Sequence, residues 1–376
     1  MSYKAIYTYA WDLAEAGVPA ATKEFLGLGL DTVTLAGSYH AGKFLRPHGK
    51  NGKVYFPEDG TVYFHADPSR YGAIKPVANS VLAERDVLSE LIEQNEMAVN
   101  VWLVLLHNTR LGMANPNSVV RNAFGDPYYY NLCPSAPEAR AYAIGLARDV
   151  TQSYQVSGIS MEAPGFNPWL ENMLGLCFCD HCVAGAEKAG VDARRFKAEV
   201  AGDIEAYLDS DIDTPTDMAE AFWRADIAAN GDLRRYLDYR SGVVTSLVAE
   251  IRASVRSDVN VAVIPSVARP TAGAWYEGSD LNALARTAGI VETCFYEPDA
   301  MRVKADLFDI RRRLKGAGKL RGILRPSYPD LSTQAEFMAA IEVLRDGGVD
   351  ELAFYNWGHL RKANLAWIGH AMRGQA

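Results

Sequence analysis

The sequence predicts an α/β protein, a (β/α)8 TIM barrel that occupies residues 1–376 as a single domain. Eight short runs of β-branched, aromatic and aliphatic residues recur along the chain, as expected for buried parallel strands. Helical patterns lie between most of these runs. A doubly wound open sheet would carry a glycine-rich phosphate turn after an early strand, and no such turn is seen. The barrel is therefore the favoured arrangement.

The predicted strands each end at or near a polar residue or a turn. They are Lys4–Trp11, Thr32–Tyr39, Ala98–Leu106, Gly158–Glu162, Asn260–Val267, Ile290–Glu297, Arg321–Arg325 and Glu351–Trp357. The predicted helices are Val77–Asn95, Pro137–Tyr154, Asp232–Val255, Ala300–Lys315 and Thr333–Asp346. Helix start signals support several of them, such as Ser332 and Thr333 followed by Glu336.

Two connections are long and would give the barrel long loops after strands 2 and 4. Residues 41–76 are rich in Gly, Pro, Tyr and Phe, and residues 164–231 form a helical insertion that contains the cysteines. Both belong to the face where barrel enzymes keep their chemistry. Connections of this length are usually functional, so we expect them to wall a pocket, with surface elaboration as the alternative.

Bulk composition excludes some classes of partner. The net charge is −8, whereas nucleic acid and anionic membranes attract basic proteins. No apolar run reaches the ~18–20 residues that span a membrane. The amino terminus lacks the basic and apolar regions of a secretory signal, so we expect a cytoplasmic protein. A homo-oligomer is compatible with the sequence.

Polar and aromatic residues follow nearly every predicted strand, and a barrel gathers such residues around one mouth. In chain order they are Trp11 and Asp12, Tyr39 and His40, His107 and Asn108, Glu162, Ser266 and Arg269, Tyr296 and Glu297, Arg325 and Tyr328, and Tyr355, Asn356 and Trp357. The strand that ends in Glu162 is the most informative, because a Pro-Gly turn follows its single acid almost at once. This pattern points to an enzyme.

Two of these acids suit glycoside hydrolysis, which needs carboxyl groups on both sides of the scissile bond. We predict that Glu162 and Glu297 are catalytic, since each ends a strand and has a proline close behind it. Asp12 is the reserve. An ion-paired or capping acid is the alternative for each. The sequence leaves open which acid donates the proton, because the outcome depends on a separation of ~5 Å or ~6.5–9.5 Å.

The other residues at the mouth are candidates for contact with a small carbohydrate. They are Asp12, Trp11, Tyr39, His40, His107, Asn108, Arg325, Tyr355, Asn356 and Trp357. Structural hydrogen bonding is the alternative for the histidines, and an ion pair with a nearby acid is the alternative for Arg325. Core packing is the alternative for the tryptophans.

Three cysteines, Cys177, Cys179 and Cys182, form a C-x-C-x-x-C motif, and thiolates this close suit a tetrahedral zinc. Cys133 is the best fourth ligand, and His181 lies within the motif. A structural zinc is favoured over a catalytic one, with a metal-free cluster as the alternative. Five cysteines are an odd number and a poor disulfide framework.

These motifs carry a family resemblance. The Asn-Leu-Cys-Pro-Ser-Ala-Pro-Glu segment at 131–138, the strand ending in Glu162 and the cysteine motif resemble (β/α)8 glycoside hydrolases in which a C-x-C-x-x-C loop follows strand 4. The chain looks more distantly like zinc-containing beta-galactosidases. The resemblance implies a retaining or inverting hydrolase with an acid on strand 4.

The chain departs from the beta-galactosidase clan in two places. Met161 stands where that clan has Asn, and strand 7 lacks the acid that the clan uses as nucleophile. Glu297 on strand 6 is therefore preferred, and acids on strands 4 and 6 look like the alpha-galactosidase clan. Two other functions stay open: a metal-dependent sugar isomerase or epimerase using Glu162, Glu297 and His40, and a non-catalytic sugar-binding barrel.

Overall fold

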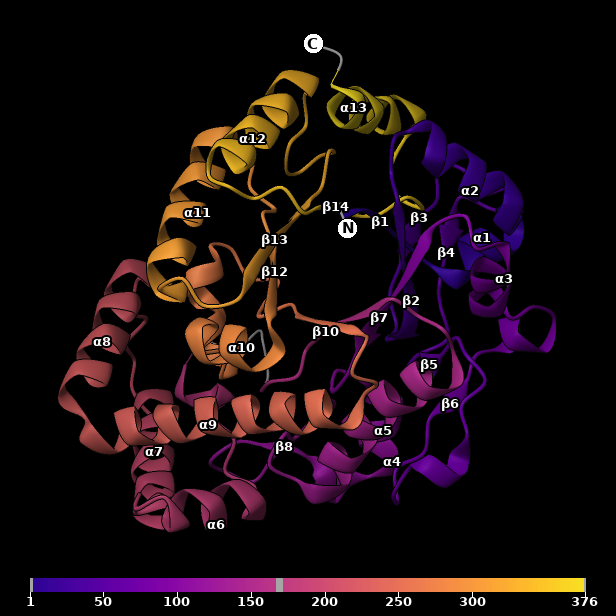
Figure 1. Ribbon diagram of the computed structural model, residues 1–376. Helices are drawn as coiled ribbons and strands as arrows, with labels where there is room; N and C mark the ends of the chain where they lie inside the picture. Colours follow the sequence, from indigo (N-terminus) through magenta and orange to yellow (C-terminus); the bar gives the residue numbers. More distant parts are fainter. Residues whose placement is uncertain (1–2, 167–171, 375–376) are drawn as a thin grey trace.

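The computed structural model describes residues 3–166 and 172–374, and its centre is a closed barrel of eight parallel strands (Figure 1). The strands pair in the order β1-β14-β13-β12-β11-β10-β7-β2, and β2 pairs again with β1. The barrel strands are β1 (Lys4–Thr8), β2 (Thr32–Tyr39), β7 (Ala98–Val104), β10 (Gly158–Glu162), β11 (Asn260–Val263), β12 (Ile290–Cys294), β13 (Lys319–Leu324) and β14 (Leu352–Phe354). The predicted (β/α)8 fold is confirmed.

Helices surround the barrel and cover its outer face (Figure 1). They are α1 (Ala10–Ala16), α2 (Val18–Gly27), α3 (Val87–Gln94), α5 (Pro137–Ser153), α9 (Gly231–Ser254), α10 (Leu281–Ala288), α11 (Ala300–Leu314), α12 (Gln334–Asp346) and α13 (Lys362–Arg373). One large hydrophobic core joins the strands to this layer, which explains why the strands are apolar on both faces. Within the described residues, no helix is long and apolar enough to cross a membrane.

The predicted boundaries hold best where a turn residue stops the strand. The bounds of β2 and β10 agree with the prediction, but the first predicted strand is three residues too long. It ends at Thr8, and α1 begins at Ala10. Trp11 and Asp12 therefore lie in the first turn of a helix, where an acidic side chain interacts favourably with the free backbone N–H groups.

The predicted helix Val77–Asn95 is wrong in its first half. The chain there forms β6 (Val77–Ala78) and a 3-10 turn, and α3 starts only at Val87. Two side chains explain the interruption: Asn79 accepts a hydrogen bond from the backbone of Val81, and Asp86 caps α3. Such caps start a helix and satisfy its first N–H groups.

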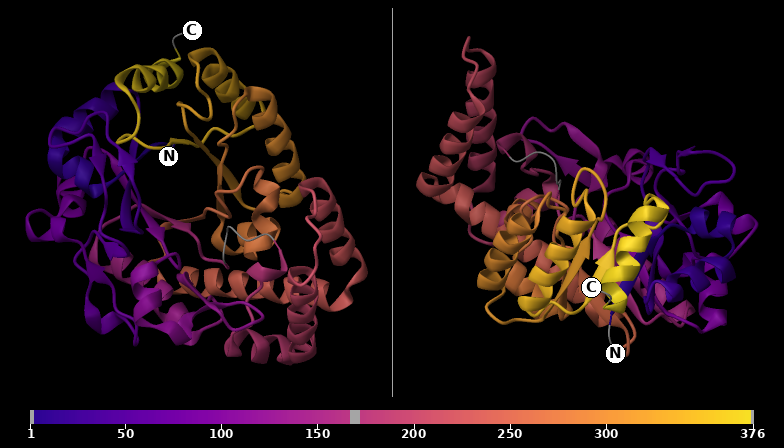
Figure 2. Two further views of the ribbon diagram at one scale, coloured as in Figure 1. Left: turned by 180° about the vertical axis from the view of Figure 1, so that it is seen from behind. Right: turned by 90° about the horizontal axis from the view of Figure 1, so that it is seen from above.

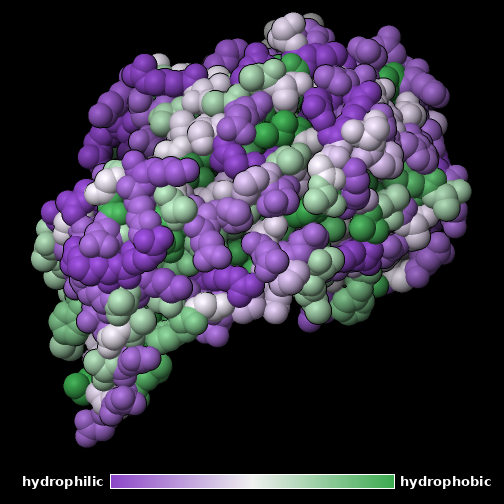
Figure 3. Space-filling view, turned by 90° about the horizontal axis from the view of Figure 1, so that it is seen from below, coloured by the Kyte–Doolittle hydropathy of each residue, from purple (hydrophilic) through white to green (hydrophobic). Residues whose placement is uncertain are grey.

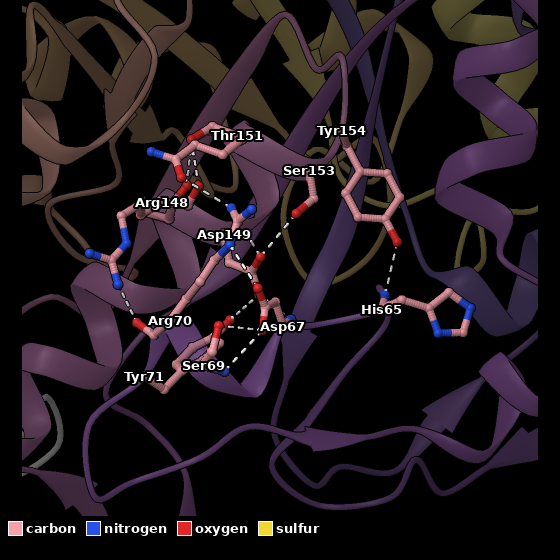
Figure 4. A network of polar contacts seen from close by, with 12 residues as sticks. His65, Asp67, Ser69, Arg70, Tyr71, Arg148, Asp149, Thr151, Ser153 and Tyr154 are labelled. Carbon is pink, nitrogen blue, oxygen red and sulfur yellow. Dashed lines mark hydrogen bonds and ion pairs between the residues drawn. The ribbon is translucent and has the colours of Figure 1, made fainter.

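The connection after β2 contains a short hairpin, β3 (Phe44–Leu45) with β4 (Val54–Tyr55), and then β5 (Thr61–Val62), which pairs with β2 and β6. Asp149 of α5 anchors the next part of this connection (Figure 4). Its buried carboxylate accepts hydrogen bonds from the backbone of Asp67 at 2.8 Å and from the Tyr71 hydroxyl at 3.0 Å, and Arg70 lies 3.4 Å away. The connection is thus fastened to a barrel helix.

The connection after β7 carries a helix and a two-stranded sheet: α4 (Thr109–Ala114), β8 (Val119–Arg121) and β9 (Pro127–Leu132). The connection after β10 carries α6 (Asp180–Lys188), α7 (Ala193–Leu208) and α8 (Thr216–Ala229). Part of this insertion packs on a separate cluster of buried hydrophobic residues.

The far end of α7 and α8 projects from the molecule (Figure 2). Figure 3 shows hydrophobic residues exposed among hydrophilic ones on this projection. No residue of α8 is buried. The projection therefore contributes no buried residues to the barrel core, and the cavity described below lies at the strand ends.

Candidate active site

A cavity of about 260 Å³ lies at the carboxyl ends of the barrel strands. All eight strands, or the residues that follow them, contribute to its wall, as is typical of barrel active sites. The lining residues are Tyr7, Tyr39, His40, Trp102, His107, Glu162, Ile264, Val267, Arg269, Cys294, Tyr296, Ile323, Arg325 and Tyr355. The volume lies just below the ~300–1,000 Å³ typical of ligand pockets, so it suits one small ligand unit.

Glu162 is the carboxylate of this cavity. It is the last residue of β10, and the strand stops there because Pro164 and Gly165 follow Ala163, whose φ is 50°. Its Oε2 accepts a hydrogen bond of 2.7 Å from Nε1 of Trp102 on the adjacent strand. Burial raises the pKa of Glu162 to about 7, and the Trp102 hydrogen bond opposes this shift. A large fraction of this carboxyl group is therefore protonated at neutral pH.

Two tyrosines of the cavity wall, Tyr39 and Tyr355, share hydrogen bonds with the buried Tyr9. The hydroxyl of Tyr9 lies 2.6 Å from that of Tyr355 and donates to that of Tyr39 at 3.1 Å. Burial raises the pKa of all three phenols. They stay neutral and can donate or accept hydrogen bonds, which suits the hydroxyl groups of a sugar.

Two histidines form another part of the wall. The rings of His40 and His107 stack with their centroids 4.2 Å apart. Burial lowers the pKa of both, that of His107 to about 3. Both rings are therefore neutral near pH 7 and add no positive charge to the cavity.

Two arginines line the cavity and share one buried carboxylate. Arg269 and Arg325 both form ion pairs with Asp330, whose side chain is fully buried. Nη1 of Arg269 also donates to the carbonyl oxygen of Tyr296 at 2.5 Å. The guanidinium carbon of Arg325 lies 4.5 Å from the centre of the Tyr296 ring. These contacts hold both cations in place.

The structure places Glu297 outside this cavity. Its side chain is buried and forms a 2.7 Å ion pair with Arg302. It borders a different surface hollow, together with Arg302 and Asp306. The two acids expected to act together are therefore not brought to one cavity, because a cation five residues further along the chain holds one of them.

Trp11 and Asp12 also lie away from the cavity wall. Trp11 stacks on Tyr9 with centroids 4.2 Å apart, within an aromatic cluster. Asp12 accepts a hydrogen bond of 2.6 Å from Arg46. Burial raises the pKa of Asp12 to about 6, although Arg46 opposes the shift. Trp11 also packs against Tyr39 of the cavity wall, whereas Asp12 fastens the connection after β2 through Arg46.

Three more of the predicted contact residues form hydrogen bonds with parts of the chain outside the cavity wall. Asn108 caps α4 through the backbone of Leu111 at 2.9 Å, and Asn356 accepts from the backbone of Gly358 at 3.0 Å. The indole of Trp357 donates to Glu24 at 3.2 Å. Of the predicted residues, the cavity wall thus includes Glu162, Tyr39, His40, His107, Arg325 and Tyr355.

Several lining residues were not among the predicted contacts. Tyr7 and Trp102 lie inside strands rather than at their ends, so the pattern of strand-end residues does not include them. Arg269 and Tyr296 do follow strands, and this position alone indicates that they could reach the cavity. Strand sequence alone does not reveal which alternate residues face the barrel axis.

Four buried thiols form a compact group in the connections after β7 and β10. The sulfurs of Cys133, Cys177, Cys179 and Cys182 all lie within 4.8 Å of one another. Cys133 is 3.8, 3.6 and 3.5 Å from the other three in that order. Bonds of about 2.3 Å to a tetrahedral zinc would place the sulfurs about 3.8 Å apart. The group therefore has the donors and spacing to hold such a metal.

Elsewhere the ligand types needed by an isomerase are dispersed. Among residues 3–166 and 172–374, the cysteine cluster is the only group of three or more His, Cys, Asp or Glu side chains close enough to hold a metal. Glu162, Glu297 and His40 are not gathered. The described residues thus offer no metal cage at the cavity.

Comparison with known proteins identifies the fold. No protein-family model and no curated protein matches this chain. Among solved structures, the PgaB (BpsB) glycoside hydrolase domain from Bordetella bronchiseptica is 15% identical with a TM-score of 0.58, and 99% of each chain is covered. The beta-galactosidase from Bacillus circulans sp. alkalophilus is 13% identical with a TM-score of 0.59.

A third structure, the alpha-L-fucosidase isoenzyme 2 from Paenibacillus thiaminolyticus, is 12% identical with a TM-score of 0.52. Matches to the fucosidase and the galactosidase cover 100% and 99% of this chain but only 49% and 55% of theirs. The chain thus spans about half of those two. At such low identity the likeness shows a barrel fold shared with glycoside hydrolases, and the chemistry rests on the cavity.

Proposed function

We propose that this protein is a glycoside hydrolase that cleaves a small glycoside or oligosaccharide, with Glu162 as the proton donor. One observation carries the proposal: a carboxyl group with a pKa of about 7 lies in the cavity at the carboxyl ends of the barrel strands. A general acid needs a pKa near the working pH. Burial of a carboxyl group against aromatic and apolar side chains is a known way to achieve this.

The proposed step is protonation of the leaving group. The carboxyl group of Glu162 donates its proton to the glycosidic oxygen as the bond from that oxygen to the anomeric carbon breaks. A water molecule then completes the hydrolysis and returns a proton. The neutral phenols and imidazoles of the wall bind sugar hydroxyls, and the volume of about 260 Å³ suits one sugar unit in the cavity.

The expected pair of Glu162 and Glu297 would require Glu297 to leave Arg302. Among the described residues, Glu162 is the only carboxylate that lines the cavity. These contacts favour a site in which the second role falls to a group of the substrate or to a tyrosine hydroxyl, as in glycosidases without a second carboxylate.

The test compares Glu162→Gln with Glu297→Gln on methyl α- and β-glycosides of common neutral and acidic sugars, because the alkoxide leaving group of these substrates needs the donated proton. We expect Glu162→Gln to lower kcat by about 10²–10⁴-fold. Glu297→Gln should change kcat less than tenfold if its role is structural. If both variants lose kcat to the same large extent and keep their melting temperatures, Glu162 and Glu297 act as a catalytic pair. Full activity of Glu162→Gln would reject the proposal, and activity on no glycoside would favour a binding protein.

We further propose that the four cysteines hold a structural zinc ion. Cys133 follows β9, whereas the other three precede or begin α6. A metal on all four would tie the connection after β7 to the insertion after β10. Four protein ligands close the coordination sphere and leave no position for substrate. The hydrolytic step is therefore independent of this site.

A further inference from the structure

We propose that the natural substrate carries a carboxylate on the sugar ring, as a uronic acid does, and that Arg269 and Arg325 bind this group. The inference rests on the proposed function and deepens it. It comes from the charges around the cavity, the hydrogen-bond donors left over there, and the charge that develops during hydrolysis.

The charges of the cavity wall do not balance one another. Two guanidinium groups line the cavity, and their common partner Asp330 supplies one negative charge. The histidines of the wall are neutral, and Glu162 carries no charge in the protonated form that acts as the acid. The occupied site therefore has about one positive charge in excess. An anionic ligand would balance this charge, whereas a neutral sugar would not.

The two arginines have N–H donors beyond those that bind Asp330 and Tyr296. Arg325 uses Nε to bind Asp330, and Arg269 uses Nη1 to bind Asp330 and the carbonyl of Tyr296. In the described part of the chain, no protein acceptor is bound by Nη1 or Nη2 of Arg325, or by Nε or Nη2 of Arg269. Each remaining pair of N–H groups can bind the two oxygens of a carboxylate in a bidentate manner.

Asp330 holds the two guanidinium groups in position and uses only some of their N–H donors. Its side chain is fully buried, while those of Arg269 and Arg325 are 38% and 25% exposed. The Tyr296 ring supports the guanidinium of Arg325. Holding both cations rigidly lowers the entropy lost when a ligand binds. A simple ion pair would need only one arginine beside Asp330, whereas two are present here.

Cleavage of a glycosidic bond builds positive charge at the anomeric carbon in the transition state. Beside a neutral sugar, the one positive charge that Asp330 does not balance would oppose the charge on that carbon. A carboxylate on the substrate removes this conflict, because it pairs with the arginines and leaves a neutral surrounding for the reacting carbon. The wall thus favours an acidic sugar in both binding and catalysis.

The experiment measures binding and so does not depend on turnover. Isothermal titration calorimetry compares the methyl glycosides of D-glucuronate and D-galacturonate, as both anomers, with those of D-glucose and D-galactose. We expect at least one uronate to bind about tenfold to a hundredfold more tightly than its neutral partner. Equal affinity within every pair would overturn the inference.

Variants identify the residues responsible. Arg325→Gln should remove most of the preference while changing the affinity for the neutral partner less than about threefold, and Arg325→Lys should keep part of it. Arg302→Gln is the matched control, because Arg302 pairs with Glu297 outside the cavity. An unchanged preference in Arg325→Gln would contradict the assignment.

Salt provides a second readout if Arg325→Gln fails to fold. Raising the ionic strength from about 0.02 M to about 0.5 M should weaken binding of the uronate to the natural chain and leave the neutral sugar unaffected. The absence of this difference would count against the inference. Uronate binding without cleavage would reject the hydrolase but keep the acidic ligand. Cleavage of neutral glycosides without a preference for uronates would support the hydrolase and reject the acidic ligand.

Discussion

The indole nitrogen of Trp102 donates a hydrogen bond of 2.7 Å to the carboxyl group of Glu162, and the two residues lie on adjacent barrel strands. This contact opposes the effect of burial on the carboxyl group. Burial raises the pKa of Glu162 to about 7, whereas the hydrogen bond stabilises the ionised form. The balance between the two places the acid within reach of neutral pH.

The first prediction is that activity is lost above neutral pH. Glu162 acts in its protonated form, which predominates below its pKa, so kcat/KM should fall about tenfold per pH unit above pH ~7. Tyr39, Tyr355 and Cys294 interact with Glu162, and burial raises the pKa of each, so they stay protonated there. A profile of kcat/KM from pH 4 to 10 measures this, and a constant rate up to about pH 9 would exclude Glu162 as the acid.

The second prediction concerns Trp102→Phe. Removing the indole N–H removes the interaction that lowers the pKa of Glu162, so the alkaline limb should move to higher pH by about one unit. Trp357→Phe is the control, because that indole donates to Glu24 away from the cavity. Overlaid profiles of kcat/KM against pH give the shift. Movement toward lower pH would mean that the hydrogen bond does not stabilise the carboxylate.

The third prediction tests the zinc site through Cys133→Ser. The purified protein should contain about one zinc per chain, and the variant should contain almost none, because one of four thiolate ligands is gone. The midpoint of thermal unfolding should fall by at least about 5 °C. Metal analysis and differential scanning fluorimetry measure these effects. Cys294→Ser, a buried thiol outside the cluster, should keep its zinc. Absence of zinc from the unchanged protein would argue for a metal-free cluster, and one zinc per chain in Cys133→Ser would exclude Cys133 as a ligand.

The fourth prediction concerns the anchor of the connection after β2. Asp149→Asn should destabilise the protein by about 2–3 kcal/mol, because the buried carboxylate binds Asp67 and Tyr71 and pairs with Arg70. Urea unfolding measures the change. Asp67→Asn is the control, since its exposed side chain bonds mainly within its own turn, and it should destabilise the protein much less than Asp149→Asn does. Similar losses in both variants would show that burial of Asp149 is not the cause.

Much of the fold could be predicted because the signals are local. The bounds of β2 and β10 follow from apolar runs that end at turn residues, and α12 begins after its predicted cap at Thr333. The boundaries failed where a side chain overrode the pattern, as where Asp86 restarts the helix after β6. The candidate site was predicted in part, since residues that follow strands reach the mouth whereas Tyr7 and Trp102 reach it from within strands.

By itself the sequence determined the barrel, the acid at the end of the fourth strand and the thiol motif, because hydrophobic periodicity and turn residues act over a few neighbouring positions. Only the tertiary structure decided which groups meet. It paired Glu297 with Arg302, set Asp330 behind two cavity arginines, and brought Cys133 to a motif more than forty residues away. The physical reason is that burial, ion pairing and the pKa of an acid depend on neighbours that are distant along the chain and adjacent only after folding.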